Sequence, residues 1–213
     1  MKSLADIRSE YTKSSLDISD VNKDPLKQFD LWFGEAIKAE VPEPNAMNLA
    51  TVSEKGTPSS RIVLLKGAEK GRFIFFTNYQ SQKGKELEET PACALTFFWP
   101  ELERQVRIEG LAQRLDSNES EVYFQSRPRS SQIGAWASPQ SSIIKNRQIL
   151  EDRVKEIEKK FEGKELLPRP NQWGGFAVTP HHIEFWQGRQ SRLHDRISYL
   201  LIDGVWKINR LAP

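Results

Sequence analysis

The chain has 213 residues, enough for one large domain or two small ones. Hydrophobic residues make up 38% and charged residues 28%, which is typical of a folded globular protein and too apolar for a disordered chain. The 31 basic and 29 acidic residues leave a net charge of +2, which argues against a general nucleic-acid coat. No stretch approaches the roughly 20 apolar residues of a membrane helix, and no apolar signal sequence opens the chain. We therefore expect a cytoplasmic protein without a membrane or nucleic-acid partner.

The N-terminal part divides into an arm and a helix. Residues 1–23 are polar and without periodicity, so we expect an arm ahead of a single domain over residues 24–213. Asp24-Pro25 has the composition of a helix start, with Asp as the cap and Pro in the first turn. Apolar residues then follow at helical spacing as far as Pro42.

From Met47 the pattern changes to short strands separated by turns. We expect strands over residues 47–53, 59–66, 72–78, 92–99, 104–115, 174–180, 181–188, 196–202 and 205–211. Helices are expected over residues 81–90, 116–124 and 143–161. This order predicts a mainly β fold with peripheral helices (α+β), an antiparallel barrel.

Standard motifs for metal ions and nucleotides are absent. His181 and His182 are adjacent, so a strand would point them to opposite faces, and His194 is distant in sequence. Cys93 is the only cysteine, which leaves no disulfide and no cysteine-based metal site. There is also no HExxH, Walker A, GxGxxG or GxSxG sequence. We predict that the protein has no metal site.

One segment of the chain is basic and contains no acidic residue. Residues 122–150 contain four basic residues and no acidic one. Within it, SRPRSSQIGAW (126–136) offers the guanidinium groups of Arg127 and Arg129 and two serine hydroxyls, all suited to phosphate oxygens. A solvent-exposed connecting loop with incidental arginines is the alternative interpretation.

Two further groups of basic residues indicate anion binding. Arg61 and Lys66 flank an apolar run, and Lys83 stands at a predicted helix start, where backbone N–H groups favour an anion.

The second group alternates along the chain. Arg192, His194 and Arg196 would share one face of an extended segment beside Trp186. The two guanidiniums would lower the pKa of His194. The alternative to anion binding by these two groups is that their basic side chains are solvated and that His194 has a structural role.

Several segments together carry a family resemblance. They are SEYT (9–12), RIVLLK (61–66), FFTNYQSQKGKELE (75–88), ERQVRIEG (103–110), YFQSRPRSSQIGAWASPQSS (123–142), WGGF (173–176), FWQG with RLHDR (185–196) and WKINRLAP (206–213). In this order they resemble the pyridoxine/pyridoxamine 5′-phosphate oxidase family over nearly the whole chain, and SRPRSSQIGAW with RLHDR is highly specific. The resemblance implies an FMN-binding split barrel, Greek-key-like and homodimeric, with its FMN sites at the subunit interface.

The resemblance also implies an activity in vitamin B6 metabolism. Pyridoxine 5′-phosphate and pyridoxamine 5′-phosphate would be oxidised to pyridoxal 5′-phosphate by hydride transfer from C4′ to N5 of FMN. Dioxygen would reoxidise the flavin to give H2O2, and the amine substrate would release NH3.

Site residues are implied by position. The implied FMN contacts are Arg61, Ile62, Val63, Leu64, Leu65, Lys66, Phe76, Thr77, Gln82, Lys83, Gln105, Gln140, Ser141, Trp186 and Arg196. The implied substrate contacts are Arg8, Ser9, Glu10, Tyr11, Lys66, Tyr123, Arg127, Ser131, Arg192, Leu193 and His194. The first four of these would form a lid. Arg192 and His194 would be the catalytic pair that orients the ring and assists proton removal, and Arg196 would stabilise the reduced flavin.

Two positions depart from the family pattern. Gln82 replaces a usual Arg, and the lost charge-assisted bond would weaken FMN binding by roughly 1–3 kcal/mol. Phe76 replaces a frequent Tyr, with a smaller expected effect.

Other functions remain as alternatives. Another FMN-dependent split-barrel oxidoreductase would not need the SRPRSSQ and RLH segments, and both are present. A non-catalytic carrier of FMN or pyridoxal phosphate would not need Arg192 and His194. A nucleic-acid binder is disfavoured by the low net charge.

Overall fold

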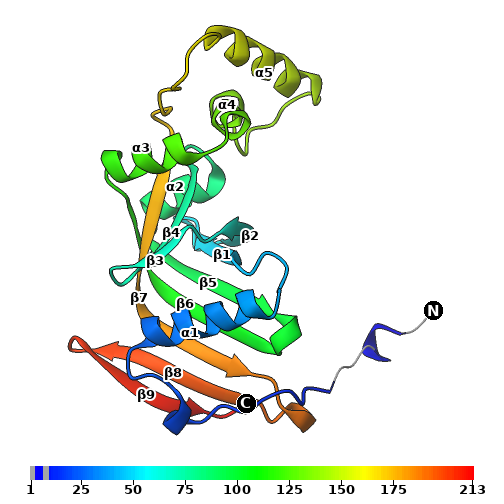
Figure 1. Ribbon diagram of the computed structural model, residues 1–213, viewed down its shortest axis with the longest axis vertical. Helices are drawn as coiled ribbons and strands as arrows, with labels where there is room; N and C mark the ends of the chain where they lie inside the picture. Colours follow the sequence, from blue (N-terminus) through cyan, green and yellow to red (C-terminus); the bar gives the residue numbers. More distant parts are fainter. Residues whose placement is uncertain (1–2, 7–9) are drawn as a thin grey trace.

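A computed structural model describes residues 3–6 and 10–213 (Figure 1). In these residues nine strands form one antiparallel sheet, in the order β2-β1-β5-β6-β7-β4-β3, with β8 and β9 continuing from β7. The strands are β1 (Ala46–Val52), β2 (Pro58–Leu64), β3 (Gly67–Glu69), β4 (Arg72–Asn78), β5 (Ala92–Trp99), β6 (Arg104–Arg114), β7 (Trp173–Gln187), β8 (Asp195–Ile202) and β9 (Val205–Leu211). The helices are α1 (Pro25–Lys38), α2 (Gln82–Glu89), α3 (Ser117–Ser126), α4 (Arg129–Ala137) and α5 (Gln148–Lys160), with short 3-10 helices η1 (Leu4–Asp6), η2 (Ile18–Asp20), η3 (Pro100–Leu102) and η4 (Gln190–Arg192).

The long strand β7 divides the sheet into two parts. Its residues 173–178 pair with β4 and its residues 182–187 pair with β8, while β6 pairs along both halves. We expected two strands here, and this was wrong. The β6–β7 register shifts between Glu109 and Gly110, and Pro180 lies opposite Gly110. This irregularity accommodates a residue that has no N–H to donate, so the strand continues through the proline.

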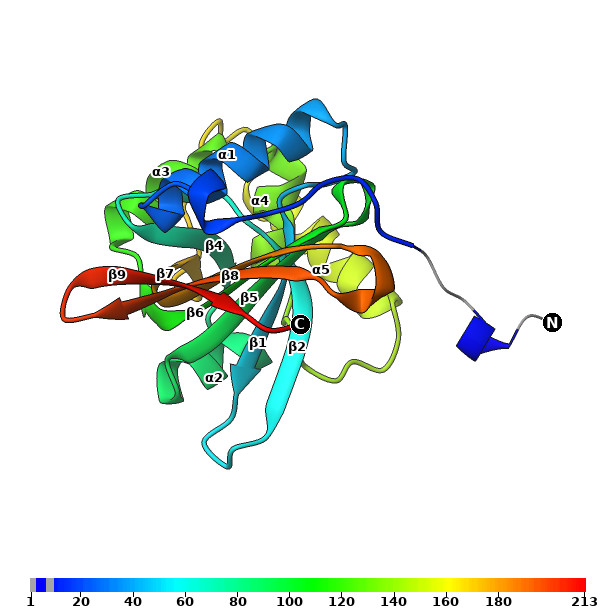
Figure 2. The same ribbon diagram turned by 90° about the horizontal axis from the view of Figure 1, so that it is seen from below.

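The sheet curls into a half-barrel with helices at its periphery, which confirms the predicted fold class. Figure 1 shows α3, α4 and α5 at one end and the β8–β9 hairpin at the other. Figure 2 shows α1 covering one side, with the β1–β2 hairpin projecting from the opposite side. In the described part of the chain, no helix is long and apolar enough to cross a membrane.

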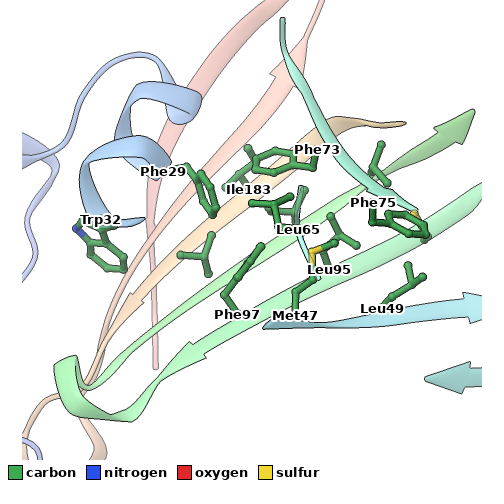
Figure 3. Close-up of a cluster of buried hydrophobic side chains, with 14 of the residues drawn as sticks. Phe29, Trp32, Met47, Leu49, Leu65, Phe73, Phe75, Leu95, Phe97 and Ile183 are labelled. Carbon is green, nitrogen blue, oxygen red and sulfur yellow. The ribbon is translucent and has the colours of Figure 1, made fainter. Parts of the chain in front are cut away.

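The core lies between the concave side of the sheet and α1. Strand residues alternate between buried and accessible positions, as in β5, where Leu95 and Phe97 point inward. Helix α1 begins as expected, because Asp24 Oδ1 accepts a hydrogen bond from Leu26 N at 2.9 Å. The buried side chains drawn and labelled in Figure 3 are Phe29, Trp32, Met47, Leu49, Leu65, Phe73, Phe75, Leu95, Phe97 and Ile183.

One prediction for the helical segments was wrong. Residues 143–147 are not helical, and α5 begins only at Gln148. Asn146 Oδ1 accepts a hydrogen bond from Ile149 N at 3.3 Å, so this side chain supports the first turn and marks the start of the helix.

The basic segment, for which a connecting loop was the alternative interpretation, is helical. Residues 129–137 form helix α4 and not a loop. Pro128 stands at its start with a φ of −54°, which suits a helix beginning. The buried Gln132 donates from Nε2 to the carbonyls of Phe124 and Arg127, at 3.1 and 3.0 Å, and fixes the turn between α3 and α4.

Candidate active site

The first group of site residues lines a cavity of about 330 Å³ between β2, β4, α2 and α3. We call it the cationic cavity. Its lining residues are Arg61, Ile62, Val63, Leu64, Lys66, Phe76, Thr77, Lys83, Tyr123, Arg127, Gln140 and Trp173. All of these except Trp173 were expected at the site from the sequence, although they come from four separate stretches of the chain.

Positive charge dominates this cavity. Arg61, Lys66, Lys83 and Arg127 line it, and no acidic side chain is among the described residues of the lining. Lys66 is exposed, and its side chain makes no hydrogen bond or ion pair with the described residues. Unpaired cations around a small cavity attract an anion such as phosphate.

Arg127 is held against an aromatic ring and not by hydrogen bonds to its Nη1. Its guanidinium carbon lies 4.4 Å from the centre of the Trp173 ring, and Nη1 is buried without a hydrogen-bond partner. Burial lowers the pKa of Arg127, and the nearby Tyr123 partly opposes this effect. A buried N–H group without an acceptor is costly, so this arrangement points to a ligand that supplies the acceptor.

An aromatic wall lies beside Arg127. The rings of Phe76 and Tyr123 stack with centres 3.8 Å apart, and Trp173 lies 5.5 Å from Phe76 at an interplanar angle of 12°. These rings come from β4, α3 and β7, which meet because β4 pairs with the first half of β7. Trp173 was not singled out from the sequence. Its only signal was its place in the WGGF segment.

Lys83 and Thr77 form the other end of the cavity. Lys83 Nζ lies 3.4 Å from Thr77 Oγ1 and 3.2 Å from Gln140 Oε1. Burial lowers the pKa of Lys83 and the charge of Arg61 lowers it further, while Glu86 opposes both. Two cations are therefore held close together, which an anionic ligand would relieve.

A second cavity of about 260 Å³ adjoins the first and shares Arg127, Gln140 and Trp173 with it. Ser131, expected to bind substrate, lines this second cavity. Arg127 thus lines both cavities, together with Lys66 in the first and with Ser131 of α4 in the second.

A second group of site residues lies at the far end of β7. Tyr11, Trp186 and His194 form what we call the aromatic cluster. The Trp186 and His194 ring centres are 4.5 Å apart, and Tyr11 lies edge-on to both at 5.7 and 5.9 Å. Glu10 precedes Tyr11 and is exposed, whereas Arg8 and Ser9 lie outside the described residues.

A hydrogen bond selects one tautomer of the neutral His194 ring. Its Nδ1 accepts a hydrogen bond from Arg189 N at 3.1 Å, so a neutral ring carries its proton on Nε2. Burial lowers the pKa of His194, the charge of Arg192 lowers it further, and Asp195 opposes both. The expected direction is confirmed. Burial is the larger cause, however, and Arg196 is not among the causes.

The expectation of one extended face for Arg192, His194 and Arg196 was wrong. Arg192 belongs to η4 and has a φ of +61°, so the chain turns there instead of extending. Arg192 and Leu193 are exposed, and Arg192 makes no hydrogen bond or ion pair with the described residues.

Arg196 lies on β8 and is bound by a buried carboxylate. Its Nε and Nη2 donate to Glu184 at 2.8 and 3.0 Å, and Nη1 donates to Ala212 O. Arg196 and Gln105 both pair with Trp186 across the sheet, so these three residues form a row on one face.

Among the described residues, the second group lies outside the cationic cavity. None of Gln105, Trp186, Arg192, His194 and Arg196 lines the cationic cavity. Trp173 and Trp186 stand at opposite ends of β7, thirteen positions apart or roughly 40 Å along the strand.

Three other expected FMN contacts do not line the cationic cavity. Leu65 is in the core, Ser141 is exposed outside the cavity, and Gln82 is directed toward Glu86. In the part of the chain that the structure describes, no group of three or more His, Cys, Asp or Glu could hold a metal ion.

Comparison with solved structures defines the class of this fold. The chain matches an FMN-binding protein related to pyridoxamine 5′-phosphate oxidase from Nostoc punctiforme, with a TM-score of 0.68 and 17% identity over 87% of this chain and 97% of that chain. The fold is that of the FMN-binding split barrels. A family model described as pyridoxamine 5′-phosphate oxidase matches residues 33–161, and one described as the pyridoxine 5′-phosphate oxidase C-terminal dimerisation region matches residues 173–213. The chain therefore belongs to the pyridoxine/pyridoxamine 5′-phosphate oxidase family, which confirms the resemblance read from its sequence.

Individual relatives agree with this assignment. The chain is 56% identical to a pyridoxine/pyridoxamine 5′-phosphate oxidase from Burkholderia mallei over 216 residues, covering 100% of both chains. It is 54% identical to one from Synechocystis, covering 99% of this chain and 98% of the relative. It also matches PhzG from Burkholderia lata, solved in complex with tetrahydrophenazine-1-carboxylic acid, with a TM-score of 0.87 and 31% identity over 94% of this chain and 100% of that chain.

Proposed function

We propose that this protein uses FMN to oxidise pyridoxine 5′-phosphate and pyridoxamine 5′-phosphate to pyridoxal 5′-phosphate. Its relatives at 54–56% identity are named pyridoxine/pyridoxamine 5′-phosphate oxidases, which supports the proposal. The observation that carries the proposal is Arg127, whose buried Nη1 has no partner within a cavity lined by three further cations. Such a cavity needs a strongly anionic ligand. A phosphorylated aromatic molecule would supply acceptors for the cations and a ring for the wall of Phe76, Tyr123 and Trp173.

The cationic cavity offers two sets of phosphate donors. We assign Arg61, Lys83 and Thr77 to the phosphate of FMN, because they converge at one end. Lys66, Tyr123, Arg127 and Ser131 are left for the vitamer phosphate at the other end. Two separate sets are required because two phosphorylated ligands must be held side by side.

When bound, FMN would supply the redox chemistry, as the acceptor of the C4′ hydride that O2 reoxidises with formation of H2O2. With the amine substrate, water would hydrolyse the resulting imine, supplying the aldehyde oxygen of pyridoxal 5′-phosphate as NH3 leaves. The protein contributes orientation and charge. His194 is suited to donate from Nε2 to the vitamer, because Nδ1 already accepts from Arg189. This favours an orienting role over proton abstraction by His194.

Arg196 has a narrower role than its charge alone suggested. Glu184 is almost fully buried and takes two hydrogen bonds from Arg196, so much of the positive charge is compensated. We propose that Arg196 donates hydrogen bonds to the flavin ring system. It would not be the main group that stabilises the negative charge of the reduced flavin.

We further propose a homodimer in which the aromatic cluster of one subunit completes the cationic cavity of the other. The C-terminal region that the family model describes as a dimerisation region contains Trp186, His194 and Arg196. The roughly 40 Å along β7 between Trp173 and Trp186 also supports a site shared between subunits. The cytoplasmic location, the single domain over residues 24–213 and the lid formed by residues 8–11 stay predictions.

The test of the function is spectroscopic and chemical. The purified protein is reconstituted with FMN, freed of unbound flavin and given pyridoxine 5′-phosphate in air. We expect retained yellow colour and equal amounts of pyridoxal 5′-phosphate and H2O2. Loss of the flavin on desalting, or the absence of both products, would refute the proposal. A substrate arm with an aromatic carboxylic acid that lacks phosphate tests the alternative suggested by PhzG, and we expect no turnover there.

Arg192→Ala is expected to abolish most turnover while FMN stays bound. Arg192 is exposed, unpaired and outside the cationic cavity, so its removal leaves the phosphate donors of FMN intact. Flavin absorbance after desalting and peroxide release measure the two properties separately. A variant that loses FMN yet turns over when FMN is supplied would show that the roles of the arginines are assigned wrongly.

A further inference from the structure

A buried carboxylate lies directly behind the cationic cavity. Glu86 on α2 is 6% exposed, and its Oε2 accepts hydrogen bonds from Thr51 Oγ1 at 2.5 Å and Ser59 Oγ at 2.7 Å. Its Oε1 accepts from Gln82 Nε2 at 2.9 Å. Burial raises the pKa of Glu86, but these hydrogen bonds and the charge of Arg61 outweigh it and lower the pKa to about 2. Glu86 is therefore ionised whenever the protein is folded near neutral pH.

The same two hydroxyls hold Arg61. Arg61 Nη1 donates to Thr51 Oγ1 at 2.5 Å and Nη2 donates to Ser59 Oγ at 2.6 Å, and Nη2 also makes a longer hydrogen bond and ion pair with Glu86 Oε2 at 3.4 Å. A hydroxyl has one proton to donate. Because Thr51 and Ser59 give that proton to Glu86, their lone pairs are left to accept from Arg61. The carboxylate thus sets the direction of both hydroxyls and, through them, the place of the guanidinium.

We propose that Glu86 is a positioning residue that, through Thr51 and Ser59, fixes the Arg61 guanidinium at the wall of the cationic cavity for the phosphate of FMN. This inference rests on the proposed function, which places that phosphate beside Arg61. Gln82, which the sequence suggested as a direct FMN contact, belongs to the same network. Its amide binds Glu86, and Gln82 does not line the cavity.

The charge of Glu86 and its role as a hydrogen-bond acceptor act in opposite directions on FMN. A carboxylate near the cavity repels a phosphate, whereas an acceptor that orders Arg61 favours binding. Glu86→Gln and Glu86→Ala remove the same charge. Only Glu86→Ala also removes the acceptor, so the difference between these two variants isolates positioning.

The experiment is a titration of apoprotein with FMN and, separately, with riboflavin, which has no phosphate. We expect Glu86→Gln to bind FMN at least as tightly as the wild type, and Glu86→Ala to bind it about tenfold more weakly than Glu86→Gln. Riboflavin affinity is expected to be equal in all three proteins. A general structural role would weaken both flavins together. Thermal unfolding of each apoprotein reports on stability separately.

Equal FMN affinities for Glu86→Ala and Glu86→Gln would overturn the inference, and so would equal losses for FMN and riboflavin. Ser59→Ala is a milder variant in case Glu86→Ala does not fold. It removes one of the two linking hydroxyls, and we expect about threefold weaker FMN binding with unchanged riboflavin binding. Unchanged FMN affinity in Ser59→Ala would also contradict the inference. A wild-type protein that binds no FMN would refute the proposed function together with this inference.

Discussion

Arg127→Ala is expected to raise KM for pyridoxine 5′-phosphate roughly 100-fold while the affinity for FMN changes by less than about threefold. The guanidinium is stacked on Trp173, and its Nη1 has no partner among the described residues, so it is free to bind a ligand oxygen. Removing it deletes charge-assisted bonds to one phosphate. The phosphate of FMN retains Arg61 and Lys83 at the other end of the cavity.

Arg129→Ala is the matched control for this experiment. Arg129 is two residues away on the same basic segment, but its guanidinium donates to the carbonyls of Lys164 and Phe161 at 2.7 and 2.8 Å. It lines neither of the two adjoining cavities. We expect unchanged KM and kcat. Similar kinetic losses in both variants would mean that general charge, and not the place of Arg127, determines substrate binding.

Arg127→Lys separates charge from shape. Lysine keeps the positive charge but cannot stack as a plane on Trp173 or offer two parallel N–H donors. KM is therefore expected to lie between those of the wild type and Arg127→Ala. Steady-state kinetics at saturating FMN measure this order directly.

The sequence predicted the local elements well where one signal dominates. Asp24-Pro25 starts α1, the helix expected over residues 81–90 is α2, and the apolar run over residues 72–78 is β4. It failed where a tertiary contact competes with a local signal. Pro180 indicated a strand end, but the irregular pairing with β6 carries β7 through it. No element was predicted over residues 129–137, where the buried Gln132 stabilises a helix.

The composition of the site could be predicted, but its geometry could not. Charge and motif pointed to Arg61, Lys83 and Arg127, which are far apart in sequence and line one cavity. The partners that orient them carry no such signal. Glu86 and Glu184 look like ordinary surface acids until burial places them against Arg61 and Arg196. The turn at Arg192 depends on a positive φ at a residue that is not glycine, which alternation along the sequence cannot reveal.

The activities of two heterodimers distinguish a site that is shared between subunits from a site that lies within one subunit. In a two-fold symmetric dimer each site would combine one subunit's Arg127 with the other subunit's Arg192. We expect homodimers of Arg127→Ala and of Arg192→Ala to be nearly inactive. A heterodimer of the two variants has one site with both arginines intact, because both substitutions fall in the other site. It should show about half of the wild-type kcat with a normal KM.

The reciprocal heterodimer is the control. It joins a wild-type subunit to one that carries both Arg127→Ala and Arg192→Ala, so every shared site loses one arginine and little activity is expected. If each site lay within one subunit, this second heterodimer would keep half of the activity and the first would have none. Two affinity tags allow each heterodimer to be isolated before its kinetics are measured. The two arrangements thus predict opposite activities for two heterodimers that carry the same two substitutions. The separation of the cationic cavity from the aromatic cluster along β7 favours the site shared between subunits.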